Sequence, residues 1–411
     1  MSQNQLSQLQ ASPTERHIPW GVVTLGIVSF LTDLSSETVF AVLPIYFVGV
    51  IGGSTLVLGV MEGLADFAAS SLDLASGHVS DRTGRRKWIA FSGYSLSALA
   101  KSLLVLTASV GGVIAFRVID RLGKSIRGAP RDALLASLAP KGRRGLSFGL
   151  HKAMDKAGAV IGPFAAYLIL SRWGETPETF HSLFIVALLP ALAAVVLLGF
   201  LVKDRTVATN RPRETIRKTW RRLGQPYRRY LLSSAVFSLG YFSVAFLVLK
   251  AKSVGFAAQD QALLYGLFNL VFTIVSLPIG WLGDRMGQRV IVITSYLMYA
   301  GMTAGLMLAD SQIAVGVMFG VYGVFYAMNE GQSKAYLSDL SEEETRATAI
   351  GIYGFVTGLL YLPASLIAGA LWTVGPAWTF AFAMGTSLAA LTLFLLTSDS
   401  EASNRTSVST S

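Results

Sequence analysis

Long apolar segments fill most of this chain of 411 residues and limit the folds that it can adopt. A helix needs about 20 residues to cross the hydrocarbon core of a bilayer, and twelve segments reach roughly that length. Only 14% of the residues are charged, against about 25% in ordinary soluble domains. The sequence therefore predicts an all-α membrane protein, because a helix satisfies its own backbone hydrogen bonds inside lipid. The predicted spans are residues 20–50, 55–79, 88–108, 112–136, 146–171, 180–202, 230–253, 260–281, 289–309, 312–338, 345–373 and 377–397.

One charged loop occurs twice, once in each half of the chain. The first copy, residues 77–87, reads Gly-x-x-x-Asp-Arg-x-Gly-Arg-Arg-Lys. The second copy, residues 280–289, keeps the Asp-Arg pair but has Gln288 in place of the first arginine of the basic tail. The two copies lie about half of the chain apart, and each connects two long apolar segments. This repetition indicates two parallel repeats that form similar bundles.

The loop resembles the one between helices 2 and 3 of major facilitator superfamily transporters. The resemblance extends from Trp20 to about Thr397, and it implies twelve transmembrane helices in two pseudo-symmetric six-helix bundles that hold a substrate between them. It also implies that the loop braces a cytoplasmic gate, with Asp81 facing the start of the eleventh span around residues 345–349. The candidate gate residues, with one arginine of the fourth span included, are Gly77, Asp81, Arg82, Gly84, Arg85, Arg86, Asp284, Arg285 and Arg131.

The distribution of positive charge predicts the orientation in the membrane. The middle segment carries ten basic and two acidic residues, and the positive-inside rule assigns it to the cytoplasm. Both termini are then cytoplasmic, and we expect a multi-pass protein of the inner (plasma) membrane. The predicted parts are a disordered cytoplasmic N-terminal tail (1–17), an N-terminal six-helix bundle (18–202), a basic cytoplasmic linker (203–229), a C-terminal six-helix bundle (230–397) and a cytoplasmic C-terminal tail (398–411).

Ionisable residues within the spans are candidates for function, because a charge in hydrocarbon is costly. The spans of the first half contain eight acidic and eight basic residues, whereas those of the second half contain mainly Glu330 and Lys334. We expect most of them to neutralise one another as internal ion pairs. Those near mid-depth are the candidates for proton coupling and for the substrate cavity: Asp33, Glu37, Asp66, Asp120, Arg121, Lys124 and Asp155.

The fourth span is unusually basic, with four arginines and one lysine between Arg117 and Arg131. Part of this run can attract an anionic or carboxylate-bearing substrate. Aromatic residues of the second half, namely Tyr241, Phe242, Tyr322 and Tyr326, are candidates for an apolar wall opposite it.

The fifth span contains Gly149, Gly158, Gly162 and Pro163 in the pattern Gly-x8-Gly-x3-Gly-Pro. This pattern resembles the antiporter signature of facilitator proteins, although two larger residues stand where that signature has two more glycines. The resemblance implies export in exchange for protons. Glycines at this spacing also permit an ordinary close contact between helices, so both interpretations stay open.

Three hypotheses for the function follow. The first is a secondary active transporter that works by alternating access, as a proton-coupled antiporter for efflux of a small organic molecule or drug. The second is proton-coupled uptake of a small anionic metabolite. The third, a membrane enzyme or sensor, is disfavoured because the sequence has no phosphate-binding loop and no cluster of metal ligands. We expect a monomer in the lipid bilayer with a small-molecule substrate, no nucleic acid, and no cofactor, with the proton gradient as the energy source.

Overall fold

The computed structural model describes residues 18–140, 144–202, 220–342 and 345–408. Within them, twelve membrane-length spans form two bundles of six, which confirms the predicted fold class. The first bundle consists of α2 (Trp20–Ile45) with its continuation η2 (Tyr46–Val50), α3 (Thr55–Thr83), α4 (Arg86–Leu106), α5 (Val110–Leu138), α6 (Arg144–Trp173) and α7 (Pro177–Leu201). The second consists of α9 (Gln225–Leu239) with α10 (Val244–Ser253), α11 (Ala258–Met286), α12 (Gln288–Leu308), α13 (Gln312–Asp339), α14 (Arg346–Val374) and α15 (Pro376–Val408).

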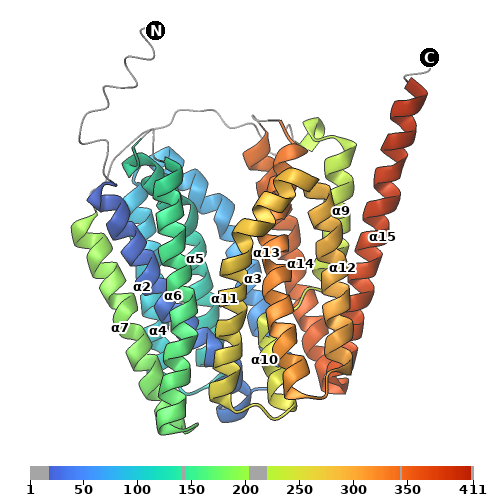
Figure 1. Ribbon diagram of the computed structural model, residues 1–411. Helices are drawn as coiled ribbons and strands as arrows, with labels where there is room; N and C mark the ends of the chain where they lie inside the picture. Colours follow the sequence, from blue (N-terminus) through green and yellow to red (C-terminus); the bar gives the residue numbers. More distant parts are fainter. Residues whose placement is uncertain (1–17, 141–143, 203–219, 343–344, 409–411) are drawn as a thin grey trace.

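The described part of the chain begins and ends on the same side of the molecule, where α2 starts and α15 finishes (Figure 1). We call this the terminal side, and the other the opposite side. Helix α15 continues well into the segment assigned to the C-terminal tail. The predicted N-terminal tail, residues 1–17, and most of the predicted linker, residues 203–219, lie outside the described residues.

Ten of the spans are long and apolar enough to cross a membrane by composition alone. The other two, α3 and α5, contain several ionisable residues each. They pack against each other, and α3 also packs along α14 of the second bundle, so both helices line the middle of the molecule. Their charges are therefore placed where protein and a cavity surround them, which is where a membrane protein tolerates them.

Side-chain caps begin several helices on the opposite side. Ser54, Ser109 and Ser311 each accept a hydrogen bond from a backbone N–H in the first turn of the helix that follows. These bonds satisfy donors that have no partner within the helix. At the terminal end of α3, Gly84 has a φ angle of 67°, a left-handed conformation that ends the helix and turns the chain into α4.

The two bundles meet closely along α3 and α14 on the opposite side. A Cβ atom at Gly63 would lie 3.0 Å from the Cα of Leu362, and one at Gly369 would lie 2.9 Å from the carbonyl oxygen of Thr55. Glycine at these positions therefore lets the two backbones approach each other. This contact closes the opposite side of the molecule.

The seventh span is broken, which the sequence analysis did not predict. The continuous helix expected over 230–253 is interrupted at residues 240–243, between α9 and α10. The hydroxyl of Tyr299 donates to the carbonyl of Gly240 at 3.1 Å and accepts from the N–H of Phe242 at 3.3 Å. Non-helical backbone inside a membrane needs such partners, so Tyr299 stabilises the break.

Candidate transport cavity

A polar cavity of about 600 Å³ lies between the two bundles. Its wall includes Arg131 and Lys152 of the first bundle and Ser333 and Ile350 of the second, all near the terminal ends of their helices. On the opposite side, the wall reaches only to residues such as Arg117, where the bundles are in contact. The cavity therefore extends from mid-depth toward the terminal side, as in a transporter that faces this side.

Ion pairs neutralise most of the charges that the first bundle contributes. This agrees with the expectation that most charges within the spans are paired. The pairs at or next to the cavity are Glu62–Arg117 at 2.8 Å, Asp66–Arg121 at 3.3 Å, Asp132–Arg131 at 2.9 Å and Asp155–Lys152 at 3.5 Å.

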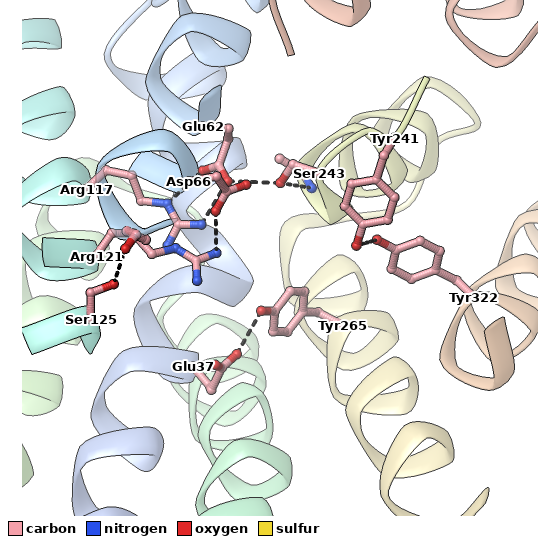
Figure 2. A network of polar contacts seen from close by, with 12 residues as sticks. Glu37, Glu62, Asp66, Arg117, Arg121, Ser125, Tyr241, Ser243, Tyr265 and Tyr322 are labelled. Atoms are coloured by element: carbon pink, nitrogen blue, oxygen red, sulfur yellow. Dashed lines mark hydrogen bonds and ion pairs between the residues drawn. The ribbon is translucent and has the colours of Figure 1, made fainter. Parts of the chain in front are cut away.

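The pair of Glu62 and Arg117 is the best-defined of these (Figure 2). The Nε and Nη2 atoms of Arg117 each donate to one carboxylate oxygen of Glu62 at 2.8 Å, and both side chains are almost fully buried. Ser243, at the break of the seventh span, donates to the same carboxylate at 2.9 Å. A single carboxylate thus connects α3, α5 and the second bundle.

Glu62 and Ser243 were not among the predicted site residues. Glu62 precedes Asp66 by four residues, so the two lie on the same face of α3. That spacing could have identified Glu62. Gly240, which ends α9, and Ser243, which caps α10, are weak sequence signals of the helix break that brings this hydroxyl to the first bundle.

Glu37 makes a second polar contact between the bundles. The hydroxyl of Tyr265, on α11, donates to its carboxylate at 2.7 Å (Figure 2). Asp33 lies one turn earlier on α2 and also lines the cavity. In the part of the chain that the structure describes, neither carboxylate has an ion-pair partner within 4 Å.

Arg121, Lys124, Asp66 and Asp155 also lie in the cavity wall. The carboxylate of Asp155 accepts a hydrogen bond from Ser29 at 2.7 Å and lies 3.8 Å from Nη1 of Arg131. Arg131, predicted as a gate residue, thus contributes to the wall of the cavity.

Asp120 is a correction to the predicted cavity residues. It does not line the cavity but is buried against α4, where Nζ of Lys101 lies 3.1 Å from its carboxylate. Gly123 lies one turn later on α5 and packs directly on Ser97 of α4. This face of α5 is therefore turned toward α4, and depth along the helix axis alone could not show that.

Aromatic rings dominate the wall from the second bundle. Tyr241 and Tyr322 line it with their hydroxyl groups 3.3 Å apart, and Tyr326 lies beside them. Phe242 was predicted to belong to this wall, and that prediction is wrong. The helix break turns its ring into the core of the second bundle, where it contacts Phe380.

The side chains of the central gate residues, Gly77, Asp81 and Arg82, lie outside the described residues, so the predicted contact of Asp81 remains a prediction. The two arginines that follow them differ in their surroundings. Arg86 donates to the carbonyl of Ala133 at 3.2 Å, and Arg85 is exposed. In the second copy of the loop, Asp284 accepts from Gln288 at 3.4 Å and Arg285 lies over the ring of Trp281.

The glycines of the fifth span divide into two groups. Added Cβ atoms at Gly158 and Gly162 would collide with the backbone of α2, whereas Gly149 has open space around it. Pro163 faces Gly266 of α11 and so lies at the contact between the bundles. The two inner glycines therefore permit close packing between α6 and α2, and the implied export function stays a prediction.

A carboxylate on the opposite side connects the bundles at their rim. Glu175, in the loop before α7, accepts a hydrogen bond from the N–H of Ala258 at the start of α11, at 2.5 Å. An acidic group is favourable there, since it complements the positive end of the helix dipole, typically by about 0.3–1 kcal/mol. This contact must break whenever the opposite side opens.

We therefore expect Glu175→Gln to shift the protein toward the state that is open on the opposite side, by about twofold to fivefold. The sequence contains no cysteine, so spin labels can be attached at Gly111→Cys and Asp310→Cys, one in each bundle on that side. Electron paramagnetic resonance distances between them should show a larger long-distance population in the variant. An unchanged distribution would mean that Glu175 does not hold the rim closed.

Two six-helix bundles around a polar central cavity define a membrane transporter. The comparisons with known proteins agree with this class and identify the family. The family model described as Major Facilitator Superfamily matches residues 25–250 and 230–410, so the chain belongs to the major facilitator superfamily. It is a multi-pass transporter of a small-molecule substrate in a lipid bilayer, and not an enzyme.

Relatives of known sequence or structure support the assignment. The chain is 34% identical over 388 residues to an uncharacterized MFS-type transporter of Methanocaldococcus jannaschii, covering 93% of this chain and 95% of the relative. It is 32% identical to multidrug resistance protein MdtH of Photorhabdus laumondii over 134 residues, a third of each chain. A crystal structure of a mutant of the nucleoside transporter NupG superposes with a TM-score of 0.78 at 12% identity, over 92% of this chain and 99% of that one, which shows the shared fold.

Proposed function

We propose that the chain is a proton-coupled antiporter that exports a small organic molecule across the inner (plasma) membrane, with its terminal side in the cytoplasm. The observation that carries this proposal is the position of Asp33 and Glu37. Both carboxylates lie in the cavity wall without an ion-pair partner among the described residues, and Glu37 accepts the hydrogen bond of Tyr265 from the other bundle.

Protonation of Glu37 would remove the negative charge that makes this hydrogen bond strong. The contact between α2 and α11 would then weaken, so proton binding and the movement of the bundles would be linked. A substrate with a cationic group would compete with the proton for these carboxylates, and such competition is the basis of antiport. The glycine pattern of α6 and the partial similarity to MdtH also favour export.

A second candidate function is proton-coupled uptake of a small anionic metabolite. The ammonium group of Lys124 favours it, since it is exposed in the cavity without an ion-pair partner in the described residues. Inside-out vesicles with an acidified lumen separate the two. Antiport predicts that added substrate releases protons from the lumen and restores the fluorescence of a pH-gradient dye, whereas symport predicts no release.

Asp33→Asn and Glu37→Gln are expected to reduce gradient-driven transport by at least about tenfold, because each amide can no longer exchange a proton. Substrate exchange without a gradient needs no net proton movement, so it should persist at saturating substrate, although the loss of a carboxylate weakens binding of a cationic group. Both activities are measured with the same labelled substrate in proteoliposomes, and Glu178→Gln serves as the control because Glu178 is exposed and remote from the cavity. Gradient-driven transport at the normal rate in both variants would contradict the proposal.

A further inference from the structure

The cavity wall contains two charged groups that are not committed to other contacts. Arg127 donates to Ser97, and Lys156 lies over the ring of Phe272. Among the described ionisable side chains of the wall, Asp33 and Lys124 are the two for which the structure has no hydrogen bond, ion pair or ring contact. They have opposite charges and come from neighbouring helices of the same bundle.

Each of these charges affects what the other can bind. Asp33 and Lys124 line the same cavity, so the charge of each acts on a ligand held by the other, although the described residues include no ion pair between the two. A purely anionic ligand at Lys124 would therefore be repelled by Asp33, and a purely cationic ligand at Asp33 would be repelled by Lys124. A ligand that carries both charges complements the two groups at once.

The cavity wall formed by the second bundle is aromatic and favours a ligand that contains a ring. The ring centroids of Tyr322 and Tyr326 lie 5.2 and 5.4 Å from that of Phe268. All three rings line the cavity, so they offer a surface for a planar group. A volume of about 600 Å³ accommodates a ligand of ordinary drug or metabolite size. The cavity thus has a charged wall of both signs opposite an aromatic wall.

We propose that the transported substrate is a zwitterion with an aromatic ring, whose cationic group binds Asp33, whose anionic group binds Lys124, and whose ring lies against the tyrosines of the second bundle. This inference rests on the proposed function, since it names the substrate class of the same cavity. The cationic group takes the position that a proton would occupy on Asp33. One molecule thereby combines competition with the proton and recognition by Lys124.

The test uses ligands that share a ring and differ only in charge. Tryptophan is the zwitterion, tryptamine the cation and 3-indolepropionate the anion, and a parallel phenyl series consists of phenylalanine, phenethylamine and 3-phenylpropionate. Binding to the full-length purified protein is measured by calorimetry in detergent without a gradient. The zwitterion of at least one series should bind about tenfold more tightly than its cation and its anion, the gain expected from one additional charge-assisted contact.

Two variants assign the contacts. Lys124→Gln should reduce the affinity for the zwitterion to that for the cation, and should leave the cation unaffected or more tightly bound. Asp33→Asn should reduce it to the affinity for the anion. The exposed Asp310→Asn on the opposite side is the control and should behave as the wild type.

A zwitterion that binds no better than its singly charged relatives overturns the proposal, and so does the absence of binding by all six compounds at about 10 mM. These outcomes come from the wild-type protein and do not depend on the folding of a variant. They also leave the vesicle experiment intact, since proton release there reports coupling whatever the substrate class.

Discussion

Glu62→Gln is expected to destabilise the folded protein by about 3–5 kcal/mol, because it leaves the buried guanidinium of Arg117 without its counter-charge. Arginine cannot relieve this by losing its proton. The substitution also weakens the hydrogen bond from Ser243, which connects the first bundle to the broken helix of the second. The effect should appear as a large decrease in the midpoint of thermal unfolding in detergent, which is measured by fluorescence-detected gel filtration.

Two further variants separate the charge effect from the loss of a side chain. The double variant Glu62→Gln/Arg117→Gln should be more stable than Glu62→Gln, since it removes the uncompensated charge. Glu178→Gln, at an exposed carboxylate in the first turn of α7, should lower the midpoint far less than Glu62→Gln. A midpoint for Glu62→Gln equal to that of the wild type would mean that cavity water solvates Arg117 or that another carboxylate neutralises it.

Gly369→Val is expected to reduce transport by about 10- to 100-fold while the protein still inserts and folds. The added side chain would push on the backbone of Thr55 and Leu56, since a Cβ atom alone would lie 2.9 Å from the carbonyl oxygen of Thr55 and 3.0 Å from the Cα of Leu56. Overpacking of this kind costs about 1–3 kcal/mol. That energy acts only in the state in which α3 and α14 touch, so the closed opposite side should lose population.

Transport in proteoliposomes and the spin-label distance between positions 111 and 310 measure the two effects together. The distance should increase as transport falls. Gly301→Ala, at a glycine with nothing within 4 Å of an added Cβ atom, should change neither. Full transport by Gly369→Val would show that the α3–α14 contact does not have to form during the cycle.

The spans could be predicted from the sequence because apolar length is a local property. The twelve segments correspond to the observed helices, and Asp33, Glu37 and Lys124 lie in the cavity wall as their depth along the helices suggested. The side of each helix on which a given residue faces the cavity was harder to predict. Asp120 lies at a similar depth to Arg121, but one residue rotates the side chain by about 100° and turns it toward α4.

Other features depend on partners that are distant in sequence. The break at residues 240–243 contains no proline, and its backbone is held by Tyr299, which is more than fifty residues away. The hydrogen bond of Tyr265 to Glu37 joins residues of different bundles. Such contacts form only in the assembled molecule, so the sequence predicted Glu37 but not its partner Tyr265 from the second bundle.

The first bundle contributes mainly charged residues to the cavity wall and the second mainly aromatic ones. This difference affects how the chain can evolve toward other substrates. Replacing one ion-paired residue of the first bundle leaves its partner as an uncompensated buried charge. A change of charge there therefore needs two simultaneous substitutions. A ring in the second bundle can be exchanged for another apolar or hydroxylated side chain in one step and at a modest cost. Homologous transporters that share the first bundle should therefore diverge in substrate range mainly through single replacements among the tyrosines and phenylalanines of the second.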